Sequence, residues 1–344
     1  MGTGIVYDPI YLEHDTGSHP ENSNRLISAM NLLESSGLID RLVSLPPRMA
    51  TENELMAIHT QEHIVNVQAC SERGGAWLDG DTFCSKASYK AALYAAGGLL
   101  RGVDAIMNVD LNSTFGLVRP PGHHATRARA MGFCLFNNIA IAARYAQREH
   151  GIRRIMIVDF DVHHGNGTQE AFYDDPDVLY FSTHLYPFYP GTGDVDEIGI
   201  SNGEGATVNV PLPGGCGDEQ YRQVYQEVLA PVADRFQPEM IMVSAGYDPH
   251  WSDQLAMMQL SITGFAQIIK TIKDLADAHC EGRTLITLEG GYNLEAIAHG
   301  VRATFEVLLG ETEIDDPMGG PRYGGSGPSI DKLLQRIKQT HQLT

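Results

Sequence analysis

Short apolar runs alternate along the chain with longer segments in which apolar residues recur every three or four positions. The short runs are almost continuously hydrophobic, as expected for strands that are buried on both faces of a sheet. We predict strands at Ile5–Tyr7, Thr114–Val118, Ile155–Val158, Val178–Phe181, Met240–Val243 and Leu285–Leu288. We predict helices at Asn24–Ser35, Lys86–Met107, Asn137–His150, Glu219–Arg235, Ile262–His279 and Leu294–Leu309. Strands that alternate with helices predict one α/β domain, with a parallel sheet covered by helices on both faces.

The last part of the chain has a different pattern. Residues 316–328 are rich in glycine and proline, which indicates a linker or an extended loop. Beyond it, Ile330, Leu333, Leu334 and Ile337 form one apolar face of a short helix. We therefore divide the chain into a catalytic domain, residues 1–310, and a segment, residues 311–344, that ends in an amphipathic helix. We expect this helix to pack back onto the domain, and a contact in a homo-oligomer is the alternative.

The charge and the cysteines narrow the class of protein. The chain has 344 residues, with 24 Lys and Arg against 43 Asp and Glu, and its formal net charge is −19. Such a balance argues against a nucleic-acid partner, whose phosphates are bound by Lys and Arg, and it suits a cationic substrate. Five scattered cysteines predict reduced thiols rather than a disulfide framework, and so a cytoplasmic protein. The longest apolar stretch, Ala91–Leu100, is too short to span a membrane.

Polar residues that can bind a metal ion or take part in catalysis follow five of the predicted strands. In a parallel sheet the carboxyl ends of the strands meet at one edge, where open α/β sheets bind ligands. The residues that we expect to converge there are His123, His124, Asp159, Asp161, His163, Ser182, Thr183, Asp248 and Tyr292.

A metal site is the first inference from this set. Asp159, Asp161 and His163 alternate in the sequence, so an extended strand end would direct all three to one side. Asp161 and His163 can share one divalent ion, and Asp248 is the natural third ligand. Three N/O ligands with an open position are typical of catalytic zinc, although iron and manganese also accept such ligands. In the alternative interpretation, Asp161 and His163 only satisfy backbone groups in a turn, which leaves the rest of the set unexplained.

The remaining residues indicate hydrolysis of a carbonyl compound. His123 and His124 follow a rigid Pro-Pro-Gly turn, and two adjacent histidines opposite a metal are suited to handling a proton. Asp159 and Asn166 are the available partners to orient them. The hydroxyl of Tyr292, in a glycine turn at a strand end, can donate a hydrogen bond to an oxyanion.

Five segments resemble, in order, motifs of the zinc-dependent histone deacetylase superfamily: RPPGHHA, DFDVHHGNGTQ, FSTHLYPFYPGTGD, AGYDPHWSDQLAMMQLS and LEGGYN. The likeness runs from about Val6 to Leu309. It is greatest to the class II-like branch, whose bacterial relatives include acetylpolyamine amidohydrolases and acetoin-utilisation proteins. The resemblance implies the arginase–deacetylase fold, with an eight-stranded parallel sheet flanked by helices.

The resemblance also implies roles for individual residues. It makes Asp161, His163 and Asp248 the zinc ligands, His124 the general base and acid, and Tyr292 the group that polarises the acetyl carbonyl. His123 becomes the electrostatic partner of His124, hydrogen-bonded to Asp159. The implied structural potassium site comprises Asp159, Asp161, the backbone of His163, Ser182 and Thr183. The implied acyl-lysine tunnel has walls Phe133 and Tyr189 and the carbonyl of Gly132, and Arg25 corresponds to the arginine of an internal acetate channel.

Departures from the family pattern bear on the substrate. Asn166 is the class II residue beside the second histidine, and the retained Tyr292 predicts an active enzyme. Leu255 occupies the place where polyamine-specific relatives have an acidic residue, which favours acyl-lysine in proteins or peptides over small acylated amines such as acetylpolyamines. The carboxylate that grips the substrate backbone is predicted at Asp79 or Asp81. Arginase-type hydrolysis at two manganese ions is disfavoured, because His164 and Asn166 stand where that site requires another aspartate, and a non-enzymatic binder is the remaining alternative.

Overall fold

Eight parallel strands form the central sheet of the computed structural model, which describes residues 2–108, 111–321 and 327–343. The strand order is β2-β1-β5-β10-β9-β6-β7-β8, and each neighbouring pair is parallel. These strands are β1 (Gly2–Val6), β2 (Val43–Leu45), β5 (Leu111–Gly116), β6 (Ile155–Asp159), β7 (Val178–Leu185), β8 (Thr207–Leu212), β9 (Met240–Ala245) and β10 (Thr284–Leu288). Strands β3 (Gly75–Trp77) and β4 (Phe83–Ser85) form a separate antiparallel hairpin. The predicted parallel α/β sheet is therefore confirmed.

The six apolar runs correspond to the six inner strands of the sheet, whereas both edge strands were missed. Strand β2 has only three residues, two of them exposed, so it produces no apolar run. Strand β8 has the sequence TVNVPL, in which polar residues and Pro211 interrupt the hydrophobic pattern. An edge strand tolerates proline because one side of its backbone has no partner strand to which it must donate.

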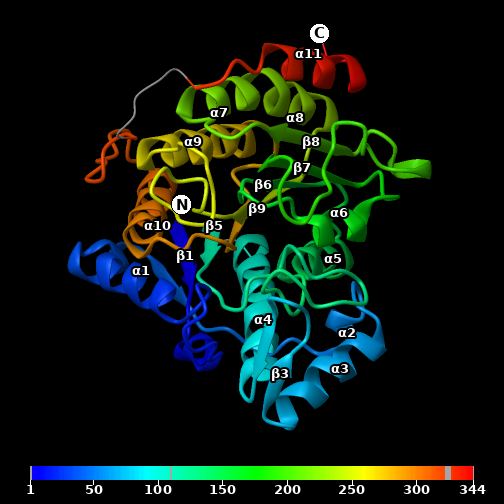
Figure 1. Ribbon diagram of the computed structural model, residues 1–344, viewed down its shortest axis with the longest axis vertical. Coiled ribbons are helices and arrows are strands. Elements are labelled where there is room, and N and C mark those ends of the chain that lie inside the picture. Colours follow the sequence, from blue (N-terminus) through cyan, green and yellow to red (C-terminus); the bar gives the residue numbers. More distant parts are fainter. Residues whose placement is uncertain (1, 109–110, 322–326, 344) are drawn as a thin grey trace.

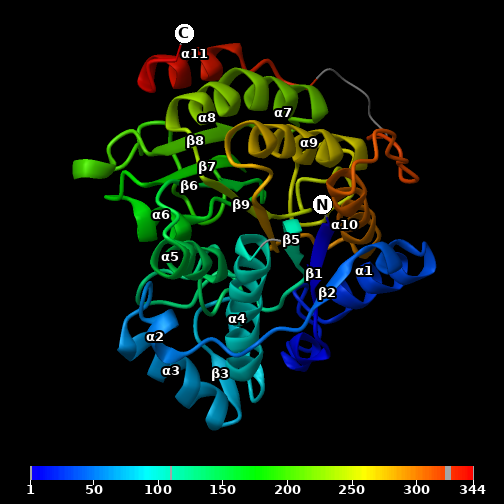
Figure 2. The same ribbon diagram turned by 180° about the vertical axis from the view of Figure 1, so that it is seen from behind.

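Helices cover both faces of the sheet (Figure 1). Helices α4 and α5 pack against one face, with α2 and α3 beyond them, and α7, α8, α9 and α10 form the other layer, where α1 packs on α10 (Figure 2). The helices are α1 (Asn24–Ser35), α2 (Glu52–Leu55), α3 (Gln61–Glu72), α4 (Ser88–Met107), α5 (Asn138–His150), α6 (Asn166–Phe172), α7 (Asp218–Val224), α8 (Ala230–Phe236), α9 (Ile262–His279), α10 (Leu294–Leu308) and α11 (Asp331–Thr340). Short 3-10 turns occur at Pro9–Glu13, Leu38–Arg41 and Ser201–Gly203. No helix among the described residues combines the length and the apolar character needed to cross a bilayer.

Local capping explains where several helices begin. The side chain of Asn137 accepts a hydrogen bond from the Ala140 N–H at the start of α5, and Ser261 does the same for the Gly264 N–H in α9. Asn293 caps α10 through the N–H groups of Glu295 and Ala296. Each of these helices follows the loop that leaves β5, β9 or β10, so the cap fixes the end of a loop at the carboxyl edge of the sheet.

The predicted helix Glu219–Arg235 is interrupted in the structure. Helices α7 and α8 are joined by a π-helical turn at Tyr225–Leu229. Pro231 lies in the first turn of α8, where it has no N–H and would clash with the carbonyl four residues earlier. The wider turn accommodates this proline without ending the helix.

The tail lies on the body of the protein. Helix α11 contacts the π-helical turn, and its apolar residues Leu334 and Ile337 are buried. Arg235 donates to the carbonyl of His341, and Trp251 Nε1 donates to the carbonyl of Gly319 at 2.9 Å. The amphipathic helix therefore packs back as expected, while the division of the chain at residue 310 stays a prediction.

Candidate active site

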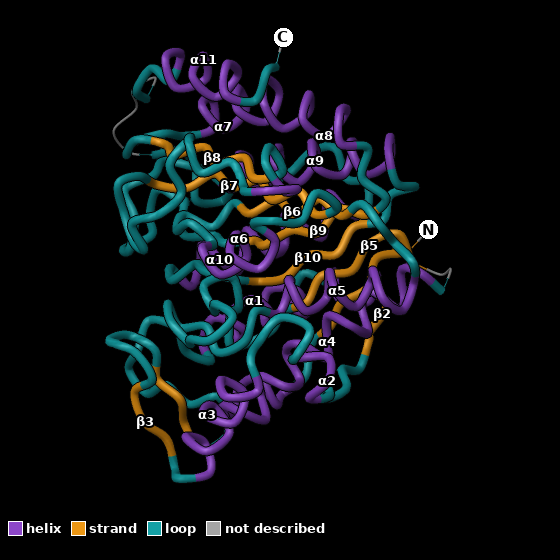
Figure 3. Tube along the Cα trace, turned by 90° about the vertical axis from the view of Figure 1, so that its right-hand side faces the viewer, coloured by secondary structure: helices purple, strands orange, loops and turns teal. Residues whose placement is uncertain are grey.

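The loops that follow the sheet strands gather on one side of the molecule (Figure 3). There the structure brings together Asp161 and His163 after β6, Asp248 after β9, His123 and His124 after β5, and Tyr292 after β10. We predicted that an extended strand end would direct Asp161 and His163 to one side. This prediction is wrong, because β6 ends at Asp159 and the chain then bends. Instead Asp159 Oδ1 accepts from the Asp161 N–H at 3.1 Å, and Asp161 Oδ1 accepts from the His163 N–H at 2.9 Å. Two successive carboxylate-stabilised turns thus replace the extended strand.

Asp161, His163 and Asp248 form a compact group of possible metal ligands, with their ligand atoms within 4.8 Å of one another. His163 Nδ1 lies 3.0 Å from Asp161 Oδ1 and 3.2 Å from Asp248 Oδ2. Asp248 Oδ1 accepts from the Val162 N–H at 3.0 Å, and Asp161 Oδ2 accepts from the Gly290 N–H at 2.7 Å. The backbone contacts that the alternative interpretation requires are therefore real, but each carboxylate has further lone pairs for a metal ion.

Two observations favour a metal ion at this group. Asp248 Oδ2 is buried and has His163 Nδ1, at 3.2 Å, as a polar neighbour but no hydrogen bond of good geometry, and burial raises the pKa of Asp248 to about 7. A Cβ at Gly290 would lie 2.3 Å from Asp248 Oδ2 and 2.4 Å from Asp161 Oδ2, so only glycine leaves the space beside both carboxylates. Two buried carboxylates that share one histidine are only partly compensated, which is costly, and a divalent cation would supply the missing positive charge. One imidazole and two carboxylates fit zinc with an open coordination position.

The two adjacent histidines have different partners. His123 Nδ1 lies 3.0 Å from Asp159 Oδ2, and His124 Nδ1 lies 2.8 Å from Asn166 Oδ1. Their ring centroids are 4.0 Å apart, and the centroid of His124 is 6.0 Å from that of His163. Because the amide oxygen of Asn166 only accepts, His124 Nδ1 carries the proton and Nε2 has a free lone pair when the ring is neutral.

The electrostatics of these histidines diverge. Burial opposes a charge on His123, but Asp159 and Asp161 outweigh it and raise the His123 pKa to about 10. Burial lowers the pKa of His124 well below its ordinary value, and the positive charge of His123 acts in the same direction. A charged His123 beside a neutral His124 separates an electrostatic role from a basic one.

Asp159 and Asn166 lie within hydrogen-bond distance of the two histidines, as their predicted role as orienting partners requires. Two carboxylates that position the site were not predicted. Glu289 Oε2 accepts from the N–H groups of Gly122 and His123 at 2.7 and 3.2 Å, which holds the histidine turn against β10. Asp253 Oδ2 accepts from the Tyr292 N–H at 2.7 Å. Glu289 directly follows the apolar run 285–288, and that position was the available signal for it.

Tyr292 is positioned by a buried charge network. The Arg25 guanidinium lies 5.1 Å from the ring centroid of Tyr292, and its Nε donates to the carbonyl of Gly291 at 2.7 Å. Arg25 Nη1 also donates to Glu21 Oε1 at 3.1 Å, and Glu21 is paired in turn with the fully buried Arg119. Arg25 therefore lies behind Tyr292, where the resemblance places the acetate channel. Glu21 and Arg119 were not predicted, because nothing in the sequence links residues so far apart.

The two predicted tunnel walls lie beside different residues of the site. The ring of Tyr189 lies edge-on to His124, with centroids 5.2 Å apart, and that of Phe133 lies 5.8 Å from Tyr292. Gly132 packs directly under the His124 ring, and its carbonyl faces the thiol of Cys134 at 3.2 Å. Phe188, which was not predicted, stacks on His163 with centroids 5.4 Å apart. The five cysteines are free, as predicted, and all five are buried.

Three predicted substrate residues lie further out. Asp79 and Asp81 occupy the turn between β3 and β4, where Asp81 Oδ1 accepts from the Thr82 hydroxyl at 3.0 Å. The Leu255 N–H donates to Asp253 Oδ1 at 3.0 Å, so Leu255 is tied to the carboxylate that also holds the Tyr292 backbone.

The residues of the implied potassium site are also neighbours. Ser182 is the register partner of Asp159 across β6 and β7, and Thr183 follows it in β7. The side chains of Asp159, Asp161, Ser182 and Thr183 are all buried, whereas His163 is only partly buried. The potassium site itself stays a prediction.

Another residue argues against a second metal ion. His164 Nδ1 bonds to Thr192 Oγ1 at 2.8 Å and Nε2 to Gln169 Oε1 at 3.0 Å, so both ring nitrogens are engaged.

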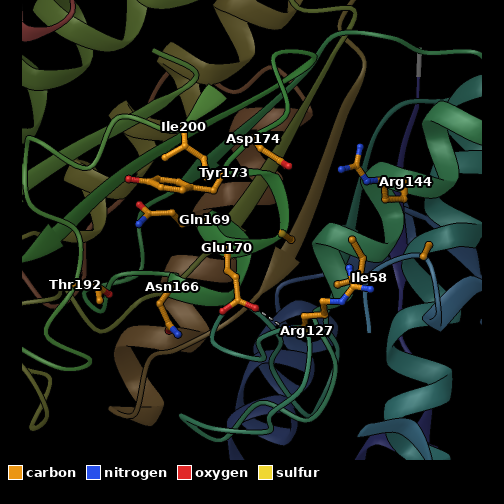
Figure 4. A pocket seen from close by; sticks show the side chains of 12 residues that line it. Ile58, Arg127, Arg144, Asn166, Gln169, Glu170, Tyr173, Asp174, Thr192 and Ile200 are labelled. Atoms are coloured by element: carbon orange, nitrogen blue, oxygen red, sulfur yellow. Dashed lines mark hydrogen bonds between the residues drawn. The ribbon is translucent and has the colours of Figure 1, made fainter. Parts of the chain in front are cut away.

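A pocket of about 630 Å³ lies beside α6 but contains none of the possible metal ligands (Figure 4). The Arg127 N–H donates to Glu170 Oε1 across it at 3.0 Å. Asn166 lines this pocket and also contacts His124. Asn166 thus separates the pocket from the histidine pair.

Comparison with known proteins agrees with this geometry. The chain matches a model of the histone deacetylase domain over residues 19–308. It is 41% identical to histone deacetylase 14, chloroplastic, of Arabidopsis thaliana, over 96% of this chain and 83% of that protein. It is 42% identical to a probable deacetylase of Archaeoglobus fulgidus, over 86% of this chain and 82% of that protein. The crystal structure of the HDA15 HD domain matches with a TM-score of 0.90 and 37% identity, over 99% of this chain and 95% of that one.

Proposed function

Because this chain belongs to the histone deacetylase family, we propose that it is a zinc-dependent amidohydrolase that removes acetyl groups from lysine side chains of proteins or peptides. Family membership supports deacetylase activity. The observation that carries the finer proposal is the Asp161, His163 and Asp248 group beside a differently charged histidine pair. Zinc, when bound to these three residues, would supply the electrophile that activates water and the acyl carbonyl.

The side chains of the protein then have separate tasks. His124 Nε2 accepts a proton from the attacking water, because Nδ1 is held as a donor to Asn166. His124 returns that proton to the amine nitrogen as the amide C–N bond breaks, which leaves acetate and a free lysine. The charge on His123, stabilised by Asp159, favours the negative charge that develops on the substrate carbonyl oxygen.

Tyr292 donates its hydroxyl proton in a hydrogen bond to the same oxygen. Burial raises its pKa well above the ordinary value, so the hydroxyl stays protonated at neutral pH. Phe133 and Tyr189 enclose the apolar stem of the acyl-lysine and exclude water from it. Asp159, Asp161, His163, Ser182 and Thr183 would hold a structural potassium ion in this proposal.

Substitution of Tyr292 by phenylalanine tests the proposal. Loss of one donor to an oxyanion costs about 10²- to 10³-fold in kcat, and we expect this loss on an acetyl-lysine peptide with zinc content and Tm retained. The matched control is Tyr94→Phe. Tyr94 lies in α4, outside the group of metal ligands, and this variant should keep wild-type turnover. Full activity of Tyr292→Phe would refute the mechanism, and faster turnover of acetylputrescine or acetylspermidine than of the peptide would move the substrate to small acylated amines.

A further inference from the structure

An exposed tryptophan lies beside the predicted tunnel. Trp77 ends strand β3, and 59% of its surface is exposed, although its ring packs edge-on against Phe83 with centroids 5.2 Å apart. Trp77 and Phe83 are register partners in the hairpin, so Phe83 accounts for only one side of the indole. More than half of the tryptophan is open to solvent.

The hairpin is attached to the tunnel wall. The Thr82 hydroxyl accepts from the Phe133 N–H at 3.0 Å, and the Leu78 N–H closes the turn by donating to the carbonyl of Thr82. A continuous row of rings leads outward from the wall: His19 lies 4.5 Å from Phe133 and 6.4 Å from Trp77, centroid to centroid. Trp77 therefore borders the place where a substrate chain would cross the mouth of the tunnel.

The same rim is acidic. Asp79 and Asp81 lie in the turn that follows Trp77, and both act on Tyr189 in the tunnel wall, whose pKa is raised first by burial and then by these carboxylates. Arg129 is the nearby countercharge, but its guanidinium is 3.8 Å from Asp79 and largely exposed. Two carboxylates, one loosely paired guanidinium and an exposed indole make a surface that attracts a cation.

We propose that Trp77, together with Asp79 and Asp81, contacts a cationic side chain next to the acetylated lysine, so that the enzyme prefers acetyl-lysine flanked by arginine or lysine. This inference rests on the proposed function, because it presumes that acetyl-lysine enters the tunnel. Neighbouring residues of an extended peptide are only 3.8 Å apart at Cα, so an arginine beside the lysine reaches the rim while the lysine fills the tunnel. An indole at an exposed site attracts a guanidinium by cation–π interaction, and the carboxylates add a charge interaction that salt screens.

The test compares two acetyl-lysine peptides that differ only by arginine or norleucine beside the lysine. Wild-type kcat/KM should favour the arginine peptide by about two- to fivefold, through KM rather than kcat, and the ratio should fall at high salt. Trp77→Ala should lower the ratio to the part that the carboxylates contribute, and Trp77→Phe, which keeps the packing on Phe83, should give a ratio between that of Trp77→Ala and that of wild type. Arg129→Ala should increase the ratio, because it removes the competing guanidinium.

Val65→Ala is the matched control, since Val65 is an exposed apolar residue on the neighbouring helix α3. It should keep the wild-type ratio. The inference is overturned if wild type hydrolyses both peptides equally well, or if Trp77→Ala and Val65→Ala have the same ratio.

Calorimetric binding of both peptides separates this inference from the proposed function. Trp77-dependent binding of the arginine peptide without any hydrolysis would refute the proposed function and support the rim contact. Hydrolysis of both peptides without a Trp77-dependent preference would support the proposed function and refute the rim contact.

Discussion

Replacing Gly132 by alanine should displace the candidate general base without touching a metal ligand. A Cβ at this position would lie 2.3 Å from His124 Cδ2, 2.6 Å from Cγ and 2.9 Å from Cβ. Ordinary contacts between carbon atoms are about 3.5–4.0 Å, so the imidazole must move by roughly 1 Å. Such a shift would disrupt the 2.8 Å hydrogen bond between His124 Nδ1 and Asn166. Misplacement of a reacting group by this amount costs about 100-fold in rate.

The backbone adds a separate cost. Gly132 has φ of +56°, and a left-handed conformation costs a non-glycine residue roughly 1–2 kcal/mol. Gly151→Ala is the matched control: Gly151 has φ of +68° at the C-cap of α5, and an added Cβ there meets no atom within 4 Å. The backbone cost should therefore be similar in the two variants, whereas only Gly132→Ala carries the clash with His124 and should lose activity.

The assay is steady-state hydrolysis of an acetyl-lysine peptide, with zinc content and thermal unfolding measured on the same samples. We expect kcat/KM to fall about 100-fold in Gly132→Ala at one zinc per chain, and to remain at the wild-type value in Gly151→Ala. The reasoning is refuted if Gly132→Ala keeps kcat/KM within about threefold of wild type. It is equally refuted if Gly151→Ala loses as much activity.

Three further predictions concern charge. The lowered pKa of His124 keeps this base neutral at pH 7, so kcat/KM should hold as pH falls to about 6.5 and decline only below that value; an acid limb above pH 6.5 would contradict the assignment. Glu289→Ala leaves buried N–H groups without an acceptor and should lower the free energy of unfolding by about 1–3 kcal/mol in urea titrations, whereas Glu289→Gln, which keeps an oxygen, should lose less. Arg119→Ala removes one of the two guanidinium partners of the buried Glu21 carboxylate and leaves only Arg25, so it should cost about 3 kcal/mol; a loss below 1 kcal/mol in the same titration would show that the network contributes little.

The core of the sheet was predictable because its strands are buried on both faces. Strands β6, β9 and β10 consist of buried residues throughout, so each appears in the sequence as an apolar run. Strands β2 and β8 lie at the edges of the sheet, and the hairpin β3–β4 has three residues in each strand, so none of them produces such a run. Hydrophobic patterning therefore predicted the layers of the fold and missed its margins.

For the site, the sequence predicted which residues would meet but not how their side chains are held. Chain topology brings the ends of parallel strands together, so residues at those ends could be expected to meet without any knowledge of side-chain positions. The turns that direct Asp161 and His163 depend on side-chain to backbone hydrogen bonds, which no periodicity encodes. Glu21 and Arg119 are 98 positions apart, and their pairing follows only from the packed fold. The orientation of Trp77 toward the tunnel rim likewise requires the hairpin to be in place.

Zinc titration of the metal-depleted protein tests the central claim most directly. Hydrolysis of an acetyl-lysine peptide would be followed as zinc is added, with the Asp161→Asn variant, altered in one proposed ligand, measured in parallel. The account predicts that kcat/KM rises linearly to a plateau at one zinc per chain, and that Asp161→Asn shows little activity at that ratio. Absence of turnover at every zinc ratio, or a plateau that requires two metal ions per chain, would contradict it.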